Sequence, residues 1–250
     1  VSVLPVNTVT KDNGDIERKF FKDDFSVDSS SQYETPYPNS YVEWSQGQLK
    51  FGRTFNQASI QSDNFKFATG QIDIVMDSGP DAIIDSYSWY YGIGFRNHNG
   101  DVIGVVALSH SPHASSYRRT LLVSGSSYIN SYHSGMPGVI ANNTTLTGET
   151  VEDRRLQVTI TNSNIIVSQW NTATGELLGT ITFINPWPGQ IGSFDIIGLP
   201  SAYGSIILKS ITVTPSISYS DNFTSDTVSG ADGRYQAVTG TVAYDDANKR

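Results

Sequence analysis

Residues 89–109 read WYYGIGFRNHNGDVIGVVALS, and this stretch decides the fold class. In its first half Trp89, Tyr91, Ile93 and Phe95 alternate with other residues, so they share one face of an extended strand. Residues 97–101 (NHNGD) form a turn signal, and a second apolar run, VIGVVALS, follows at 102–109. Two such runs joined by a short turn rich in Asn and Gly predict a β-hairpin whose alternating aromatic face lies in the core.

Short apolar runs of the same kind recur along the chain, and no segment has a convincing helical period. In residues 71–77 (QIDIVMD), Ile72, Ile74 and Met76 are expected to face inward. Further runs are RTLLVSG (119–125), LQVTITN (156–162), NIIVSQW (164–170), LLGTITF (177–183), SFDIIGL (193–199) and SIILKSITVTP (205–215). Many short strands at even spacing predict an all-β sandwich or barrel. Trp44 and Trp170 are interpreted as core residues.

Composition excludes several classes of protein. The chain has 250 residues, 38% of them hydrophobic, which is enough for a sizeable core. There is no Cys, which excludes disulfides and thiolate metal sites. The net charge of −8 makes nucleic acid a poor partner, because binding a phosphate backbone requires a basic surface. No apolar run reaches 18 residues, so we expect no membrane insertion.

A short internal repeat bears on the domain organisation. Asp23-Asp24-Phe25-Ser26 is echoed by Asp221-Asn222-Phe223-Thr224, and the pattern Gly-x-Leu-x-Phe at 47–51 recurs as Gly-x-Val-x-Tyr at 240–244. We therefore expect a linker or lead-in strand over 1–18, one complete module over 19–215, and the opening strands of a second similar module, or a docking tail, over 216–250.

The complete module resembles the laminin-G-like, concanavalin A-like jelly roll. The resemblance rests on the order of four stretches, which are DDFS (23–26), YVEWSQGQLKF (41–51), the hairpin of 92–106 and the ending GQIGSFDIIGLPSAYGSIILKSITVTP (189–215). It implies a two-sheet antiparallel jelly-roll sandwich whose last strand lies beside the first. The family includes glycan-binding and protein-binding modules, phage-appendage modules, and some glycosidases and lyases, so fold does not fix function.

A glycosidase of this superfamily carries its catalytic carboxylates on one strand as Glu-x-Asp-x-(x)-Glu. Residues 71–77 resemble that strand, but Gln71 stands at the position of the first Glu and Asp77 is displaced. A Gln side chain can neither attack as a carboxylate nor transfer the proton. We therefore predict that the chain is not an enzyme. The alternative is a polysaccharide-active glycosidase or lyase on the same jelly roll.

Two acidic clusters and a pair of histidines are candidate metal sites. The family often holds one Ca²⁺ at a rim loop, and Asp77, Asp81 and Asp85 are the candidate ligands for a structural Ca²⁺, with no other cofactor expected. Asp23, Asp24 and Asp28 form a second acidic cluster. For both clusters, ordinary solvated turn aspartates are the simpler interpretation. The spacing of His110 and His113 in a Ser/Pro loop does not favour zinc.

Sugar binding needs exposed aromatic rings beside amide, Arg or carboxylate groups, and protein interfaces use similar Tyr-rich loops. The candidate glycan- or partner-binding residues are Tyr90, Arg96, Tyr117, Arg118, Tyr128, Tyr132, His133 and Trp187.

We predict a non-catalytic binding or structural module of a tandem β-sandwich appendage, located outside the cell, on a microbial surface or on a virion. It would contact glycans or neighbouring protein subunits as part of a larger assembly. A purely architectural protein without a ligand is a third interpretation that the residues leave open.

Overall fold

A computed structural model of the chain describes residues 8–9, 18–37, 39–53, 58–77, 89–110, 119–125, 137–146, 154–199 and 206–216. The segment expected to open a second module, 216–250, lies outside the described residues apart from Ser216. The helices found in the described ranges are two short 3₁₀ turns, η1 (Ser30–Gln32) and η2 (Asp63–Phe65). None of the helices in these ranges could cross a lipid bilayer.

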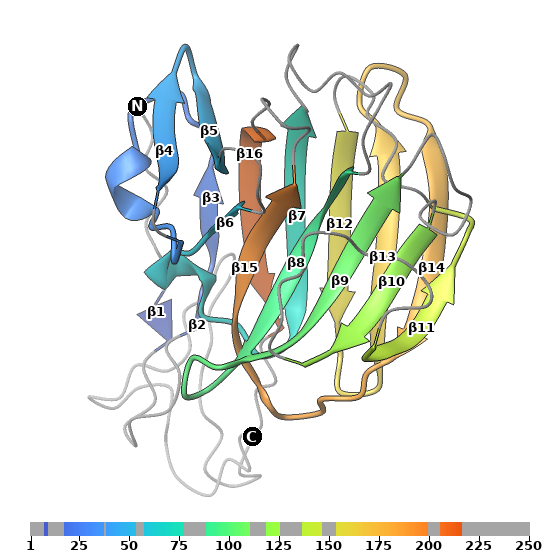
Figure 1. Cartoon of the computed structure of the whole chain (residues 1–250). Helices are drawn as coiled ribbons and strands as arrows, with labels where there is room; N and C mark the ends of the chain where they lie inside the picture. Colours follow the sequence, from blue (N-terminus) through green and yellow to red (C-terminus); the bar gives the residue numbers. More distant parts are fainter. Residues whose placement is uncertain are drawn as a thin grey trace, which may run out of the picture. The chain divides into compact units, whose positions relative to one another are not determined.

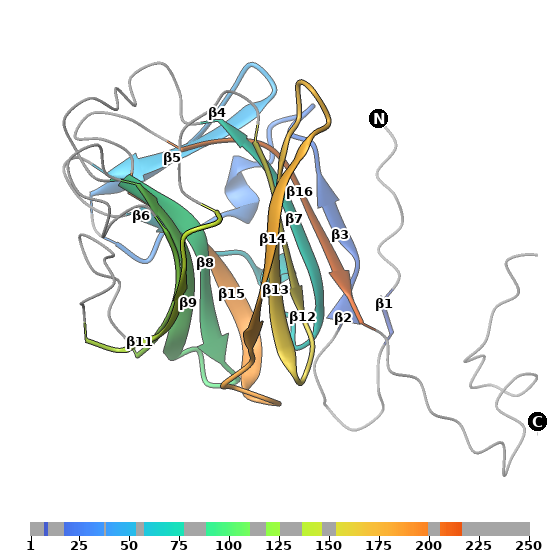
Figure 2. The same ribbon diagram turned by 90° about the vertical axis from the view of Figure 1, so that its right-hand side faces the viewer.

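Two antiparallel sheets face each other, as Figures 1 and 2 show. The six-stranded sheet has the order β11 (Val139–Asn143), β10 (Arg119–Ser124), β9 (Val102–His110), β8 (Trp89–Asn97), β15 (Ile191–Leu199), β6 (Ala58–Ile60). The eight-stranded sheet has the order β14 (Leu177–Ile184), β13 (Asn164–Asn171), β12 (Arg154–Ile160), β7 (Gly70–Asp77), β16 (Ile206–Pro215), β5 (Gln48–Arg53), β4 (Ser40–Ser45), with β3 (Phe21–Asp23) also paired to β16. A separate two-stranded ribbon joins β1 (Thr8–Val9) and β2 (Arg18–Lys19).

The predicted two-sheet sandwich is confirmed, and so is the meeting of its first and last strands. Strand β3 pairs antiparallel with β16, with Asp23 opposite Ile211. Directly after β3, Phe25 adopts a left-handed backbone with φ of 55° and is fully buried. Its carbonyl accepts a 2.8 Å hydrogen bond from the Trp44 indole N–H, so Trp44 is half-buried against the core with its polar atom satisfied.

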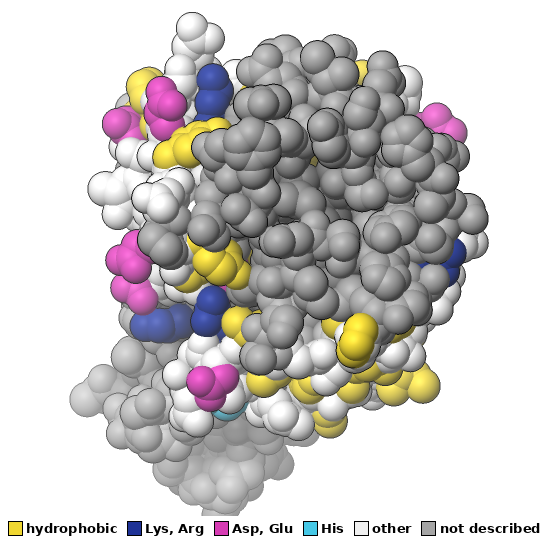
Figure 3. Space-filling model, viewed as in Figure 1, with side chains coloured by type: hydrophobic (Ala, Val, Ile, Leu, Met, Phe, Trp, Pro, Cys, Tyr) yellow, Lys and Arg dark blue, Asp and Glu magenta, His cyan; other side chains and the backbone are white. Residues whose placement is uncertain are grey.

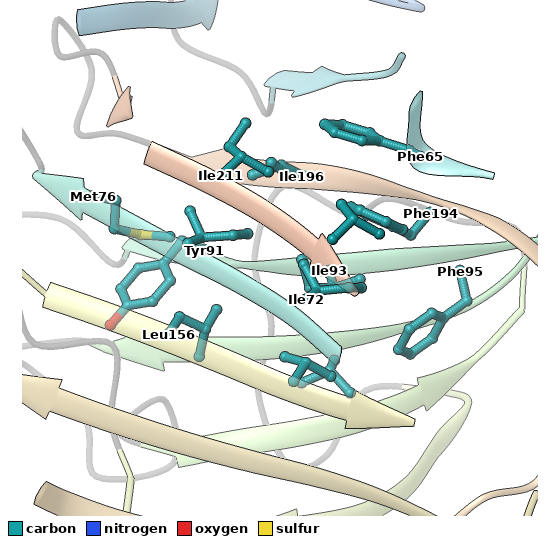
Figure 4. Close-up of a cluster of buried hydrophobic side chains, with 14 of the residues drawn as sticks. Phe65, Ile72, Met76, Tyr91, Ile93, Phe95, Leu156, Phe194, Ile196 and Ile211 are labelled. Carbon is teal, nitrogen blue, oxygen red and sulfur yellow. The ribbon is translucent and has the colours of Figure 1, made fainter. Parts of the chain in front are cut away.

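Alternation along the strands builds the core between the sheets. Strand β7 alternates strictly, so that Ile72, Ile74 and Met76 are buried, as expected from the sequence. From the opposite sheet Tyr91, Ile93 and Phe95 of β8 meet them, as Figure 4 shows. Placing apolar side chains of two facing sheets in contact is what stabilises a sandwich of this kind.

One polar contact crosses this core. Gln169 on β13 is 3% exposed, and its amide N–H donates to the hydroxyl of Tyr91 on β8. Gln169 takes an inward position on β13, which places its neighbour Trp170 on the outer face. Trp170 is half-buried there, so the expectation that it is a core residue is wrong.

Candidate functional site

A cleft of about 720 Å³ lies at one end of the six-stranded sheet. Its lining comes from four separate segments, within residues 31–34, 61–66, 96–100 and 192–195. We name it the polar cleft, because amides, hydroxyls and charged groups of both signs line it. In Figure 3 acidic, basic and histidine side chains gather at the lower left, where Figure 1 places the turn between β8 and β9.

The β8–β9 turn forms one wall and is held by its own side chains. The side-chain oxygen Oδ1 of Asn97 accepts hydrogen bonds of 2.9 Å from the backbone N–H groups of Asn99 and Asp101. Gly100 has φ of 89°, which a residue with a side chain rarely adopts, and its N–H donates to the Asn97 backbone carbonyl. The turn therefore presents its amide side chains from a fixed backbone.

Arg96 and Asp195 form a bidentate ion pair behind this wall. The Nε of Arg96 lies 2.9 and 3.0 Å from the two carboxylate oxygens of Asp195, and Nη2 lies 2.8 Å from Oδ2. Nη1 donates to the carbonyl of Gly100 at 2.6 Å. The Asp195 side chain is fully buried, whereas 18% of the Arg96 side chain is exposed. The buried carboxylate therefore positions the guanidinium, which is the partly exposed member of the pair.

The opposite wall comes from the two 3₁₀ turns. The Asn64 amide donates to the Gln32 side-chain carbonyl at 3.2 Å and so links η2 to η1. The side chain of Ser62 caps η2 by accepting from the Asn64 backbone N–H. Beneath this wall Phe65 stacks on Phe194 with ring centroids 4.4 Å apart, which anchors η2 to β15.

The outer face of the six-stranded sheet carries a second cluster of buried apolar residues. Figure 2 shows that this face is concave. Five buried residues form a cluster on it, which we name the outer patch: Val105, Ala107, Leu121, Val123 and Ile197. Asp195 and Ile197 lie on the same side of β15, so the buried carboxylate borders the patch.

The strand that resembles a glycosidase strand has a structural role. Asp73 lies on the outer face of the eight-stranded sheet, where its carboxylate accepts from Arg155 Nε at 2.8 and 2.9 Å, from Arg155 Nη2 and from Gln157 Nε2. This hydrogen bonding to Asp73 raises the pKa of Arg155 further above its usual value, against a smaller opposing effect of burial. The guanidinium also lies 4.9 Å from the ring centre of Trp170. Asp73 is thus occupied within a surface network.

The acidic clusters differ in how far the structure describes them. Asp77 is the last residue of β7, but Asp81 and Asp85 lie outside the described residues. In the other cluster, Asp23 accepts from Ser29 Oγ at 2.6 Å and from the Tyr33 hydroxyl at 2.8 Å. Burial, and then the adjacent Asp23 carboxylate, raise the pKa of that hydroxyl above its usual value.

The remaining two carboxylates of this cluster hold local turns. A hydrogen bond from Ser26 lowers the pKa of Asp24, and one from Ser30 lowers the pKa of Asp28. No group of three His, Asp or Glu side chains arranged for a metal occurs in the ranges that the structure describes. The second cluster therefore builds turns, and the calcium prediction for the first stays a prediction.

The predicted binding residues are distributed unevenly. Arg96 lines the polar cleft. Tyr90 is a residue of β8 whose side chain is not described, and five further candidates lie outside the described residues: Tyr117, Arg118, Tyr128, Tyr132 and His133.

Trp187 is not a surface residue. It is 6% exposed and packs against Phe95, with ring centroids 5.7 Å apart. A Cβ atom at Gly104 would come within 2.0 Å of the indole ring, so the glycine makes room for it. The prediction of an exposed Trp187 ring is therefore wrong.

Outside the segment 96–100, the sequence does not indicate the residues that line the cleft. Asn64, Gln32 and Lys66 lie far from the hairpin in sequence and carry no motif. One signal was present, because Asn97 and Gly100 together indicate a turn whose side chains are fixed.

Comparisons with known proteins place the fold. Neither a protein-family profile nor a curated protein sequence matches the chain. Among solved structures, the VIP36 exoplasmic/lumenal domain in its Ca²⁺/Man2-bound form matches at 11% identity with a TM-score of 0.56, over 89% of this chain and 96% of that one. The Emp46p carbohydrate recognition domain in its potassium-bound form matches at 9% identity with a TM-score of 0.54, over 78% and 96%.

A third match is the CBM2 module of the evolved Dit of Lactobacillus casei BL23 phage J-1, at 10% identity with a TM-score of 0.48, over 77% and 93%. The first two likenesses, together with the two facing sheets and their strand order, show the architecture. The chain has the concanavalin A-like jelly-roll fold.

Proposed function

We propose that residues 19–215 form a non-catalytic glycan-binding module and that the glycan binds in the polar cleft. The observation that carries this proposal is the pre-positioned set of polar groups around the Arg96–Asp195 pair. Sugars expose hydroxyl groups that both donate and accept, so a site with fixed amides and a fixed guanidinium can bind them at a low entropic cost. VIP36 and Emp46p, whose fold is similar, are carbohydrate-binding by their names or bound forms, which supports the same class of ligand.

The chemistry of the cleft favours hydrogen bonding over ring stacking. The Asn64–Gln32 contact uses one amide N–H of Asn64 and the carbonyl of Gln32. It leaves the Asn64 carbonyl and the Gln32 NH₂ group outside that bond, which gives a sugar hydroxyl an acceptor and a donor side by side. The cleft also contains Lys66 and Glu34, so charges of both signs are present.

A binding role is better supported than hydrolysis. Glycoside hydrolysis uses two carboxyl groups that contact the bond being broken. Asp195 is fully buried, and its carboxylate is held by the Arg96 guanidinium. Asp73, the residue on the glycosidase-like strand, faces outward from the other sheet and is held by Arg155 and Gln157. Neither carboxylate is placed for catalysis.

Binding is tested first on a printed array of neutral and acidic oligosaccharides and then by calorimetry with the oligosaccharide that binds best. The double variant Gln32→Ala/Asn64→Ala should weaken binding at least tenfold, about 1.4 kcal/mol. Asn162→Ala removes an exposed amide in the β12–β13 turn and is the matched control, with no expected effect. An array without any bound sugar, or an affinity that survives the double substitution, would contradict the proposal.

We also propose that the module belongs to a tandem appendage on a microbial or virion surface, with residues 216–250 opening the next module or docking on a neighbour. The support is the repeat of residues 23–26 at 221–224 and of 47–51 at 240–244. Deleting 219–250 should leave the unfolding transition of the module unchanged, because its core residues lie between Phe21 and Val213. Sedimentation should show less self-association. Identical monomers before and after deletion would argue against docking between copies.

We also propose a structural Ca²⁺ at Asp77, Asp81 and Asp85. Carboxylate oxygens suit this ion, and VIP36 has been observed in a Ca²⁺-bound form.

A further inference from the structure

Arg154 is a buried cation at the end of the sandwich that lies away from the polar cleft. It is the first residue of β12, whose residues alternate between buried and half-buried. Leu156, Val158 and Ile160 have the same parity and belong to the core, so the Arg154 side chain also points between the sheets. The residue is 9% exposed.

A contact between the two sheets shows at which end of the sandwich Arg154 lies. Leu156 pairs with Gln169, and Gln169 donates to Tyr91 near the start of β8. Figure 4 shows Tyr91 beside Met76 and Leu156 at one end of the core. The polar cleft borders Asn97, at the other end of β8. Tyr91 and Asn97 are six residue steps apart along β8, which corresponds to roughly 20 Å.

The Arg154 guanidinium has no counterpart of the carboxylates that hold Arg96 and Arg155. Among the described residues nothing accepts a hydrogen bond from its buried Nε. Its cross-strand neighbours are Met76, which is apolar, and Asn171, whose side-chain oxygen already accepts from the backbone N–H groups of Ala173 and Thr174. Arg155, one residue further on, is bound by Asp73.

A buried guanidinium nitrogen without an acceptor is costly. An ordinary buried base escapes the cost by losing its proton, but arginine stays protonated in proteins. Removing an isolated charge from water without a partner costs several kcal/mol. Buried polar groups nearly always have partners, so an exception calls for a specific explanation. A bound anion would be such an explanation, and the geometry allows it because Arg154 lies at the end of a strand.

We propose that Arg154 binds an anionic group at this end of the sandwich, of the size of a sulfate or a carboxylate. The planar guanidinium can give such a group two parallel N–H donors. The net charge of −8 disfavours general attraction of anions, so binding at this place depends on the local cation. The anion has two possible sources, which are a free inorganic ion and the acid group of a glycan.

The experiment compares unfolding transitions of the whole chain at equal ionic strength in sodium chloride, sodium sulfate and sodium glucuronate. Sulfate stabilises proteins in general, so the comparison lies between variants and not between salts. Arg154→Met replaces the cation with an apolar side chain of similar length. Lys22→Met removes an exposed cation on β3 and is the matched control for net charge.

Wild type and Lys22→Met should gain a saturable rise in melting temperature from sulfate or glucuronate that Arg154→Met lacks. In chloride, Arg154→Met should be at least as stable as wild type, because it removes a buried polar nitrogen that has no acceptor. Saturation by sulfate alone indicates a site for a free inorganic ion, and saturation by glucuronate indicates the acid group of a glycan. If Arg154→Met folds poorly, calorimetry on Arg154→Lys should show anion affinity at least tenfold below that of wild type.

Two results would overturn the proposal. Equal anion responses in all three proteins would mean that the guanidinium is only hydrated. A strong loss of stability of Arg154→Met in chloride, without any anion effect in wild type, would mean that Arg154 has a partner within the chain, for which the preceding acidic residues Glu152 and Asp153 are candidates.

Discussion

The two outer faces of the sandwich each carry one bidentate Arg–Asp pair, and the pairs differ in their surroundings. In Arg96–Asp195, on the six-stranded sheet, 18% and 0% of the side chains are exposed. In Arg155–Asp73, on the eight-stranded sheet, the values are 40% and 14%. The same chemical pair is therefore withdrawn from solvent on one face and accessible on the other.

The neighbours of each pair explain the difference. Beside Asp195 lie the buried residues of the outer patch, such as Ile197 on the same strand. Beside Asp73 lie half-buried side chains, including Val75 on the same strand and Gln157 opposite it. A buried pair is costly to break, whereas a surface pair contributes little, so the comparison teaches that equal hydrogen-bond geometry does not mean equal energy.

The largest effect is expected from Asp195→Asn. The substitution leaves Arg96 without its carboxylate in a mostly buried place and should lower the free energy of unfolding by about 3 kcal/mol. Urea unfolding measures it. Asp63→Asn is the control at the same cleft, because the Asp63 side chain is 97% exposed, and it should change little. Equal losses for both variants would show that the burial of Asp195 does not set its contribution.

A slightly smaller effect is expected from Ile197→Ala, which tests the outer patch directly. Ile197 is fully buried although it faces away from the main core, so truncation should cost about 2 kcal/mol. Val75→Ala shortens a half-buried side chain on the other outer face and should cost well under half as much. Urea unfolding of the two variants side by side decides whether the two faces differ as described.

A third and weaker effect is expected from Asp73→Asn, at about 1 kcal/mol, because the pair that it breaks is partly solvated. The same variant should bind any glycan of the polar cleft with unchanged affinity, since Asp73 lies on the other sheet. Calorimetry and urea unfolding give both values. A loss of stability as large as that of Asp195→Asn would remove the distinction between the two pairs.

Sequence reasoning predicted the sandwich because alternation is a local property. Ile72, Ile74 and Met76 needed only a period of two to be placed inside. The two tryptophans show where this reasoning failed. Trp170 is expected in the core, but the parity of its strand places Gln169 inside and Trp170 outside. The Tyr91 hydroxyl that satisfies Gln169 belongs to a strand far away in sequence, and nothing in the local pattern announces it.

The prediction of an exposed Trp187 ring is wrong for a related reason. Its flanking prolines indicate a loop, and a turn does form, with Gly189 at φ of 71° and the Gln190 N–H donating to the Trp187 carbonyl. The space that receives the ring is created by Gly104 on β9. The polar cleft is harder still to predict from the sequence, because its walls come from four distant segments and only the segment 96–100 lies at a turn that the sequence indicates.

The smallest effect is expected from Trp170→Leu, which removes the ring beneath the Arg155 guanidinium but leaves the Asp73–Arg155 pair in place. A cation over an aromatic ring at a half-exposed site contributes on the order of 0.5 kcal/mol, and a leucine keeps part of the apolar contact with the stem of the arginine. Trp170→Phe is the control, since it keeps an aromatic ring. The free energies of unfolding of the two variants in urea should differ by no more than this amount. Combining Trp170→Leu with Asp73→Asn should lower the free energy of unfolding by an amount different from the sum of the two single losses, because both residues contact Arg155. If the two losses simply add, the aromatic contact and the ion pair act independently, and the outer face of the eight-stranded sheet is a set of separate contacts in place of a network.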